Sequence, residues 1–430
     1  VGGGRVIENV TLKAEPAASG WHVSELSARL PGQARVVASG LLETDEDFGF
    51  NGDVELAVSQ PATFATWWRG RGQDGAGRLL APFDLAGHAD ISPKGISVRG
   101  MRARVGDAEI DGTFSWGEVD GKARELNTDL SASRVDFVQL KALAELLVGH
   151  NLTNADSLAK AYQLHVKADA FVFEDVTIRG VEINADYRDD ALTVTKLEIG
   201  DIGGARVYQT SGKIDRLSER PRGGLSMHVH ADDFSGVSRL ANRFAPDSGV
   251  ARWLQTAAPA LGPADFSAQV QAPPPQADNG FLLTVKNGVA GDTAFDLSLR
   301  SAGGLGTWRE KSAEVALTVH SPDSSALARQ FGVTAMPISD DAGAAVFVKG
   351  VGVPAEGLET TASGDYAGLA FDANGKLAVA EDLSPSFDGS VDLNSPNIDP
   401  IIALAGLAIP GAATGTAVEI GGNLNISSGQ

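Results

Sequence analysis

The 430-residue chain contains no cysteine. That absence excludes a disulfide scaffold, a thiolate zinc site, an iron–sulfur cluster and a catalytic thiol. Basic side chains are also scarce, because 35 Lys and Arg stand against 55 Asp and Glu and give a formal net charge of −20. This balance argues against a nucleic-acid binder, which needs a surplus of cations to neutralise phosphates.

Long hydrophobic runs are missing as well. No apolar stretch approaches the roughly 18 residues of a membrane-spanning helix, and the richest one, Pro400 to Ile409, includes Gly406. The composition is 43% hydrophobic and 21% charged, which indicates a folded protein rather than a disordered one. Because the chain begins Val1-Gly2-Gly3-Gly4, we expect a fragment that a signal peptide or membrane anchor could precede.

What the sequence does have is alternation of apolar and polar residues. From Tyr162 to Ala170, apolar or small side chains take every second position, and the same pattern returns at Phe295–Leu299 and Ala313–His320. Successive side chains of a strand point to opposite faces, so these segments predict strands with one dry and one wet face. Such one-sided strands are typical of antiparallel sheets.

Turn chemistry is abundant too. Asn-Gly and Asp-Gly pairs tolerate the positive φ angles of tight hairpins, so each pair predicts a turn. The pairs begin at Asn51, Asp74, Asp111, Asp120, Asn279, Asn287, Asn374 and Asp388.

Short helices are expected after several of the strands, where the period changes to that of an amphipathic helix. The expected helices are Thr63–Trp68, Asp136–Val148, Ser235–Phe244, Val250–Thr256, Ser324–Phe331 and Asp399–Leu407. In the longest of them, Phe137, Leu140, Leu143, Ala144 and Leu147 are expected to face the core. The predicted fold is therefore mainly β: an elongated, repetitive antiparallel β-sheet groove with a short helix closing each repeat.

The repeats suggest five modules and the start of another. Their predicted bounds are residues 1–71, 83–148, 162–256, 264–332, 340–409 and 410–430.

Three stretches resemble the AsmA-like family of bacterial envelope proteins, the family related to TamB and YhdP. The matching stretches are Gly20-Trp21-His22-Val23 through Phe50-Asn51-Gly52-Asp53, then Phe83-Asp84-Leu85-Ala86-Gly87 through Phe114-Ser115-Trp116, and Leu197-Glu198-Ile199-Gly200 through Ser211-Gly212-Lys213-Ile214. The resemblance implies a long periplasmic β-groove, an inner-membrane helix outside this chain, and transport of phospholipid toward the outer membrane of a Gram-negative bacterium. It carries no catalytic signature.

The alternating strands give a physical reason to expect the same function. Dry faces need a cover, and the expected helices are too few and short, so the cover is a second sheet or an apolar ligand such as phospholipid or another acyl-chain lipid. The dry-face positions expected to line a lipid groove are Leu164, Val166, Val176, Ile178, Leu192, Val194, Met227, Val229, Leu297, Leu299, Val315 and Leu317. The alternative is a structural or adhesive surface protein made of closed β-sandwich modules. An enzyme acting on envelope polysaccharide comes third, because no motif points to it.

Other candidate sites have simpler explanations, and we predict no catalytic residue, metal site or cofactor. His228 and His230 share one face of a strand but lack a third ligand, so we interpret them as solvated residues. The acidic run from Asp45 to Asp53 lacks the Gly and Glu of a calcium loop and is interpreted as a hairpin tip. Trp67 and Trp68, which precede Arg69 and Arg71, could touch a membrane; packing of one ring against the sheet is favoured.

Overall fold

The computed structural model describes residues 6–44, 48–70, 75–118, 124–147, 161–173, 176–216, 222–272, 280–304, 307–333, 343–397, 402 and 417–426. The protein is mainly β, with 66% of residues in strands and 15% in helices, and its strands form open antiparallel sheet with few short helices. This confirms the predicted fold class. The chain divides into two compact units, Val1–Ile199 and Gly200–Gln430.

The first unit is a run of strands that are mostly neighbours in sequence. Strands β1 to β8 pair in order and antiparallel. The strands are β1 (Glu8–Ala17), β2 (Gly20–Leu30), β3 (Ala34–Glu43), β4 (Gly49–Val58), β5 (Phe83–Ser92), β6 (Gly95–Val105), β7 (Ala108–Glu118), β8 (Arg124–Ala132), β9 (Val135–Asp136), β10 (Ala161–Phe173), β11 (Val176–Arg188) and β12 (Ala191–Asp201).

Two pairings in this unit, both made by β10, depart from the antiparallel prediction. Strand β10 runs parallel to β8 and then pairs antiparallel with β11. The short strand β9 also pairs parallel with β10, and the chain then leaves the sheet in helix α3 (Phe137–Leu147). A parallel neighbour needs a crossover of this kind, whereas a hairpin would have reversed the chain.

In the second unit every strand from β13 to β23 pairs antiparallel with the next. The strands are β13 (Ala205–Asp215), β14 (Arg222–Ala231), β15 (Ala264–Gln271), β16 (Phe281–Ala290), β17 (Thr293–Ser301), β18 (Ala313–Ser321), β19 (Ala344–Val353), β20 (Gly357–Tyr366), β21 (Leu369–Val379), β22 (Pro385–Ser395) and β23 (Val418–Ile426).

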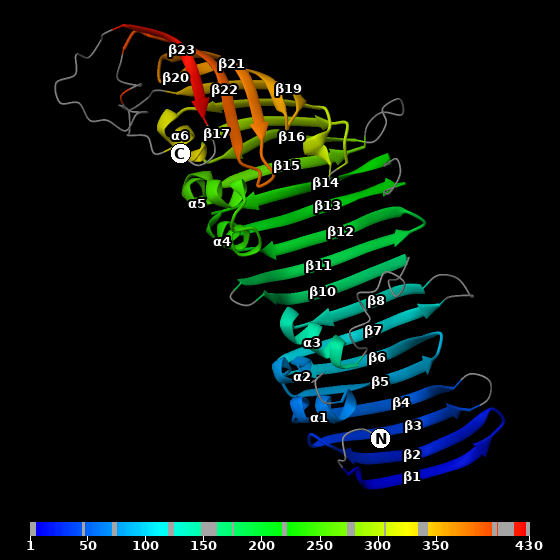
Figure 1. Cartoon of the computed structure of the whole chain (residues 1–430). Helices are drawn as coiled ribbons and strands as arrows, with labels where there is room; N and C mark the ends of the chain where they lie inside the picture. The colour runs from blue at the N-terminus through cyan, green and yellow to red at the C-terminus, as the bar shows by residue number, and fades with distance from the viewer. Residues whose placement is uncertain are drawn as a thin grey trace. The chain divides into compact units, whose positions relative to one another are not determined.

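The helices of each unit gather at one end of its strands (Figure 1). They are α1 (Pro61–Trp68), α2 (Gly75–Leu79) and α3 in the first unit, and α4 (Ser235–Phe244), α5 (Gly249–Leu261) and α6 (Ser324–Gln330) in the second. Five of the six expected helices are thereby confirmed. The sixth, Asp399–Leu407, lies almost wholly outside the described residues. Helix α2 and a 3₁₀ turn at Trp308–Glu310 were not expected.

The core of the first unit forms where its helices meet the strand ends. Ala34, Val58, Phe83 and Val105 make one cross-strand row, and helix side chains such as Leu146 bury it. Leu143 is buried as expected, but Phe137 and Leu140 are 49% and 44% exposed, so the predicted core stripe of this helix is partly wrong. The buried side instead includes Ala142 and Leu146 beside Leu143, so the core-facing side of the helix is displaced around its axis from the predicted stripe.

The predicted Asn-Gly and Asp-Gly turns are largely wrong. Five of the eight pairs lie inside strands, and the other three fall partly or wholly outside the described residues. These glycines give room to neighbouring strands: a Cβ on Gly389 would lie 2.3 Å from the Asn374 carbonyl oxygen. A true tight turn occurs instead at Asp189-Asp190, where both residues have positive φ angles.

Candidate functional site

The strand register of the second unit places apolar side chains in continuous rows on one face. One row crosses ten strands without a polar residue: Met227, Ala268, Val285, Leu297, Leu317, Val348, Ala362, Ala373, Val391 and Gly422. The adjacent row contains a single polar residue, Thr360, among Leu225, Val270, Leu283, Leu299, Val315, Gly350, Gly375, Gly389 and Leu424. We call this surface the second apolar face.

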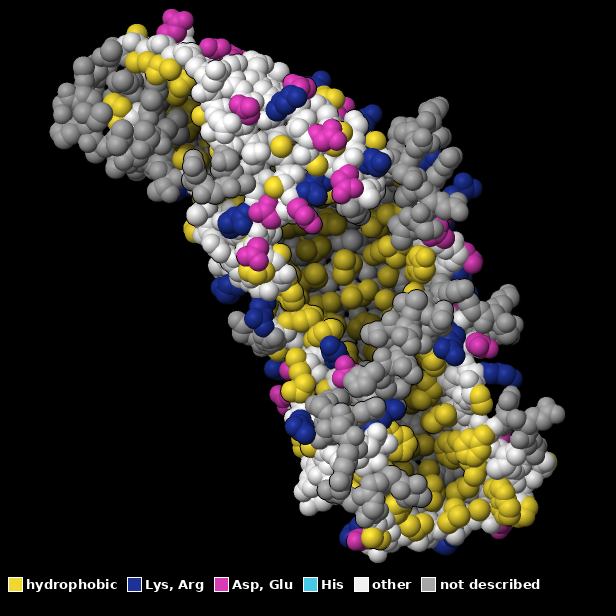
Figure 2. Space-filling view, in the orientation of Figure 1, with side chains coloured by type: hydrophobic (Ala, Val, Ile, Leu, Met, Phe, Trp, Pro, Cys, Tyr) yellow, Lys and Arg dark blue, Asp and Glu magenta, His cyan; other side chains and the backbone are white. Residues whose placement is uncertain are grey.

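The first unit carries an equivalent surface, which we call the first apolar face. Its clearest row runs through Val36, Leu56, Leu85, Ala103, Ile110, Ala132, Ala168 and Val181. Figure 2 shows hydrophobic side chains gathered in the hollow of each unit, with charged side chains along the rims.

The predicted groove residues of the second unit come together on the second apolar face. Leu297 and Leu317 stand directly opposite each other, as do Leu299 and Val315. Met227 opens the ten-strand row, and Val229 is two residues further along the same strand, opposite Phe266. All six side chains are half-buried.

In the first unit, Leu164 and Val166 lie on the first apolar face. Val166 stands between Leu130 of β8 and Ile183 of β11, and Leu164 lies between Thr128 and Ala185. All of the predicted groove residues of this unit are half-buried.

The other four predicted residues are less central. Val176 and Ile178 lie opposite Phe173 and Phe171, close to the helices, because the Phe173 ring stacks on Phe137 of α3 at 5.1 Å. Gly180 has a positive φ of 60°, which fits the change of phase between these residues and the rest of β11. Leu192 and Val194 lie on β12.

The second apolar face contains a hollow of about 700 Å³ that the sequence did not reveal. None of its lining residues is charged: Val348, Thr360, Ala362, Tyr366, Leu369, Phe371, Ala373, Leu377, Phe387, Val391, Leu393 and Leu424. Alternation in β21 and β22 is as regular as elsewhere and could have identified Phe371 and Val391 in advance. The volume falls in the range of small-molecule sites.

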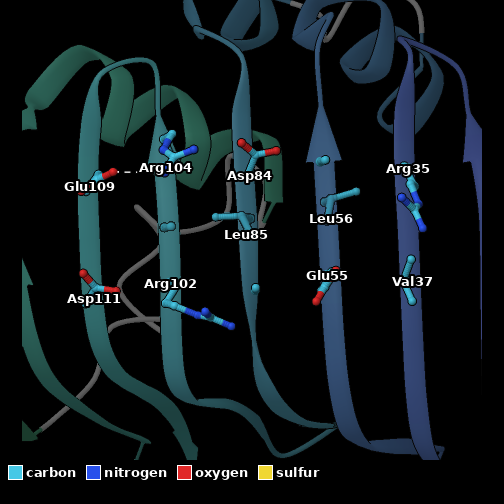
Figure 3. Close-up of a pocket in the computed structure, with 13 residues that line it drawn as sticks. Arg35, Val37, Glu55, Leu56, Asp84, Leu85, Arg102, Arg104, Glu109 and Asp111 are labelled. Atoms are coloured by element: carbon cyan, nitrogen blue, oxygen red, sulfur yellow. Dashed lines mark hydrogen bonds and ion pairs between the residues drawn. The ribbon is translucent and has the colours of Figure 1, made fainter.

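The outer face of the first unit has the opposite character. Around a hollow of about 540 Å³, Arg35, Asp84, Arg104 and Glu109 occupy one cross-strand row (Figure 3). Arg104 and Glu109 form an ion pair of 3.1 Å. Both side chains are more than half exposed, so this ion pair contributes little to stability. The charged row keeps the outer face hydrated.

The two histidines of β14 lie on the outer face of the second unit. Asp265 of β15 bridges them, since one carboxylate oxygen lies 2.9 Å from Nε2 of His228 and the other 3.0 Å from Nδ1 of His230. Hydrogen bonds from His230 and then from His228 hold the pKa of Asp265 below its ordinary value. Among the described residues, no group of three or more His, Asp or Glu side chains is arranged to hold a metal ion.

The two tryptophans of α1 lie in different environments, as expected. Trp67 packs against the core of the first unit, and Trp68 is 53% exposed. Packing of one ring against the sheet is therefore confirmed. The acidic run from Asp45 falls partly outside the described residues.

Comparisons with known proteins give no relative for this chain: no family model, no curated protein and no solved structure matches it. Within the described residues, no helix has both the length and the apolar character needed to cross a membrane. The site is therefore defined by its geometry alone: a half-exposed apolar surface in each unit.

Proposed function

We propose that this protein binds acyl-chain lipid along its apolar faces and is not an enzyme. The observation that carries the proposal is the row from Met227 to Gly422, which keeps a largely half-exposed apolar surface across ten successive strands. Laying an acyl chain along such a row removes roughly 0.8 kcal/mol of unfavourable water contact for each methylene group buried. Many weak contacts of this kind would let a lipid move along the face without one tight site.

The resemblance to AsmA-like proteins extends the proposal. It supports a periplasmic protein, anchored in the inner membrane through a segment outside this chain, that moves phospholipid between membranes during outer-membrane biogenesis. The open sheets of the two units are compatible with that role.

A structural or adhesive protein made of closed β-sandwiches is the competing function. In a sandwich, two sheets bury each other's apolar faces, and core side chains become almost inaccessible. Leu297, Leu299, Val315 and Leu317 remain half-buried, which favours the lipid-binding proposal.

A pair of adjacent substitutions tests the proposal. Leu317→Asp puts a charge on the second apolar face, whereas Ala316→Asp puts the same charge on the outer face, where Ala316 lies opposite Ser298 and Lys349. With a dansyl-labelled 16-carbon fatty acid as probe, we expect Leu317→Asp to raise Kd at least about tenfold, equivalent to about 1.4 kcal/mol. Val229→Asp should act likewise and Ala316→Asp should leave Kd unchanged. Folded variants of Leu317 and Val229 that bind the probe as the parent does would refute the proposal.

A further inference from the structure

Within the second unit, polar contacts join two segments about 130 residues apart in sequence. The first is the start of α5, and the second is the turn between β21 and β22, residues 380–384. The backbone N–H of Gly249 donates to the carbonyl oxygen of Asp382 at 2.5 Å. The guanidinium of Arg252 donates to the Asp382 carboxylate at 2.6 Å and also to the hydroxyl of Ser384. We call these four residues the latch.

The two sides of the latch fit closely. A Cβ on Gly249 would lie 2.5 Å from the Leu383 carbonyl oxygen and 2.8 Å from Cα of Ser384, so only glycine allows this approach. The turn is ordered by its own hydrogen bonds, because the Ser384 hydroxyl donates to Asp382 at 2.6 Å and the Ser384 N–H donates to it at 3.0 Å. The turn is therefore suited to move as one piece.

The latch holds the turn of the β21–β22 hairpin, whose two strands also pair on their outer sides with β20 and β23. Strand β21 starts at Leu369, opposite Tyr366, which packs in the core cluster with Leu327 of α6. The turn lies at the other end of this 11-residue strand, roughly 35 Å away at the usual rise of a strand. It nevertheless rests on α5, so the hairpin runs across the direction of the earlier strands, and Figure 1 shows β21 and β22 crossing them.

The inner side of this hairpin is part of the apolar hollow. Phe371, Ala373 and Leu377 of β21 line it, together with Phe387 and Val391 of β22. The contacts at its tip are polar and partly open to water: the side chains of Arg252 and Asp382 are 48% and 40% exposed. Exposed ion pairs are weak, so the tip is held by contacts that can open while the rest of the sheet stays paired.

We propose that the β21–β22 hairpin is a movable wall of the hollow, and that opening of the latch controls how fast an acyl chain enters and leaves. This inference rests on the proposed function, because it assigns a gate to the same apolar face. Opening of the hairpin changes the activation barrier for entry of the acyl chain and the barrier for its exit by the same amount. The gate therefore changes rates and leaves affinity alone.

Stopped-flow fluorescence of the full chain with the dansyl-labelled fatty acid tests the gate. Asp382→Asn and Arg252→Gln should raise the association and dissociation rates together by about fivefold, the effect of losing one exposed ion pair, with Kd unchanged. Lys349→Gln is the matched control, since it removes the 3.8 Å ion pair with Glu314 on the outer face of the same unit. Its rates should equal those of the parent.

The absence of cysteine allows a converse experiment on a single protein. In the double variant Arg252→Cys and Asp382→Cys, a reducible bis-methanethiosulfonate linker should hold this wall closed and slow both rates by at least about tenfold. Reduction should restore them, so each sample is its own folding control. Rates that ignore both the linker and the ion-pair variants overturn the gate. Failure of every form, the parent included, to take up the probe overturns the proposed function itself.

Discussion

The ring of Phe295 on β17 covers Gly288, its direct partner on β16. A Cβ on Gly288 would lie 2.5 Å from Cζ of that ring. Phe371 and Gly364 repeat the arrangement on β21 and β20, where a Cβ would lie 2.8 Å from Cε1. In both pairs the absent side chain lets the ring lie down over the neighbouring strand. The apolar face thus gains aromatic surface without projecting rings that would obstruct it.

Gly288→Ala should therefore destabilise the second unit. The new methyl group displaces the Phe295 ring, and overpacking of this kind costs about 1–3 kcal/mol. Urea unfolding followed by circular dichroism measures the loss. Gly422→Ala on β23 is the matched control because a Cβ there meets nothing within 4 Å, and it should leave the free energy of unfolding within about 0.5 kcal/mol of the parent. Equal effects of the two substitutions would contradict the role of the ring.

The same glycines explain where sequence reasoning failed and where it succeeded. Alternation in β17 and β18 specified the strands and their two faces, because each strand has a dry side wherever it pairs. The Asn287-Gly288 pair predicts a turn, but here the glycine lies in a strand beneath an aromatic ring. The sequence alone does not distinguish a glycine in this position from a glycine in a hairpin turn. Which one applies depends on the residue across the ladder, and the sequence does not state the register.

Helix α6 offers a test of how much an N-cap side chain stabilises the short helices. The Asp323 carboxylate accepts hydrogen bonds from the N–H groups of Ser325 and Ala326 at 2.8 and 3.1 Å. Asp323→Ala should cost about 1 kcal/mol of stability, the usual value of an N-cap. Asp323→Asn keeps an acceptor oxygen and should retain most of it. Thermal unfolding of the two variants distinguishes the cap from simple loss of charge, which both share.

The latch should give the second unit an acid-dependent contribution to stability. Hydrogen bonds from Ser384 and then from Arg252 hold the pKa of Asp382 well below its ordinary value of 3.8. Because the folded state binds this proton less readily than the unfolded state, the contribution is complete above that ordinary value and is lost as pH falls through the lowered one.

Urea midpoints of the parent and of Asp382→Asn should therefore differ by a constant amount between about pH 7 and pH 5 and converge in stronger acid. Asp372→Asn, on the outer face of β21 opposite Asp392, controls for removal of a negative charge. If the difference in urea midpoint between the parent and Asp382→Asn grew as the pH fell, the predicted direction of the pH dependence would be wrong.

The candidate site, like the fold, has features that the sequence predicts and features that it does not. Alternation of apolar and polar residues with a period of two predicts which side chains share one face of a strand. The sequence therefore predicts that Leu297, Leu317 and their neighbours lie on the apolar face. The latch is not predicted, since Arg252 and Asp382 belong to a helix and a turn about 130 residues apart. Their meeting depends on the accumulated twist of the strands between them, a quantity that no local pattern encodes.

Filling the hollow tests whether acyl chains occupy it. Ala373 lines the hollow in the middle of β21, while its neighbour Asn374 is exposed on the outer face. Ala373→Trp places an indole where the chain would lie, and Asn374→Trp places the same ring in solvent.

Because both substitutions add the same apolar group to the same strand, only the position differs. We expect Ala373→Trp to lower the amount of dansyl fatty acid bound per chain at saturation, since the remaining apolar surface still binds probe, and Asn374→Trp to leave it unchanged. Full stoichiometry in a folded Ala373→Trp variant would mean that lipid lies elsewhere on the apolar faces and that the hollow serves only the packing of β19 to β23.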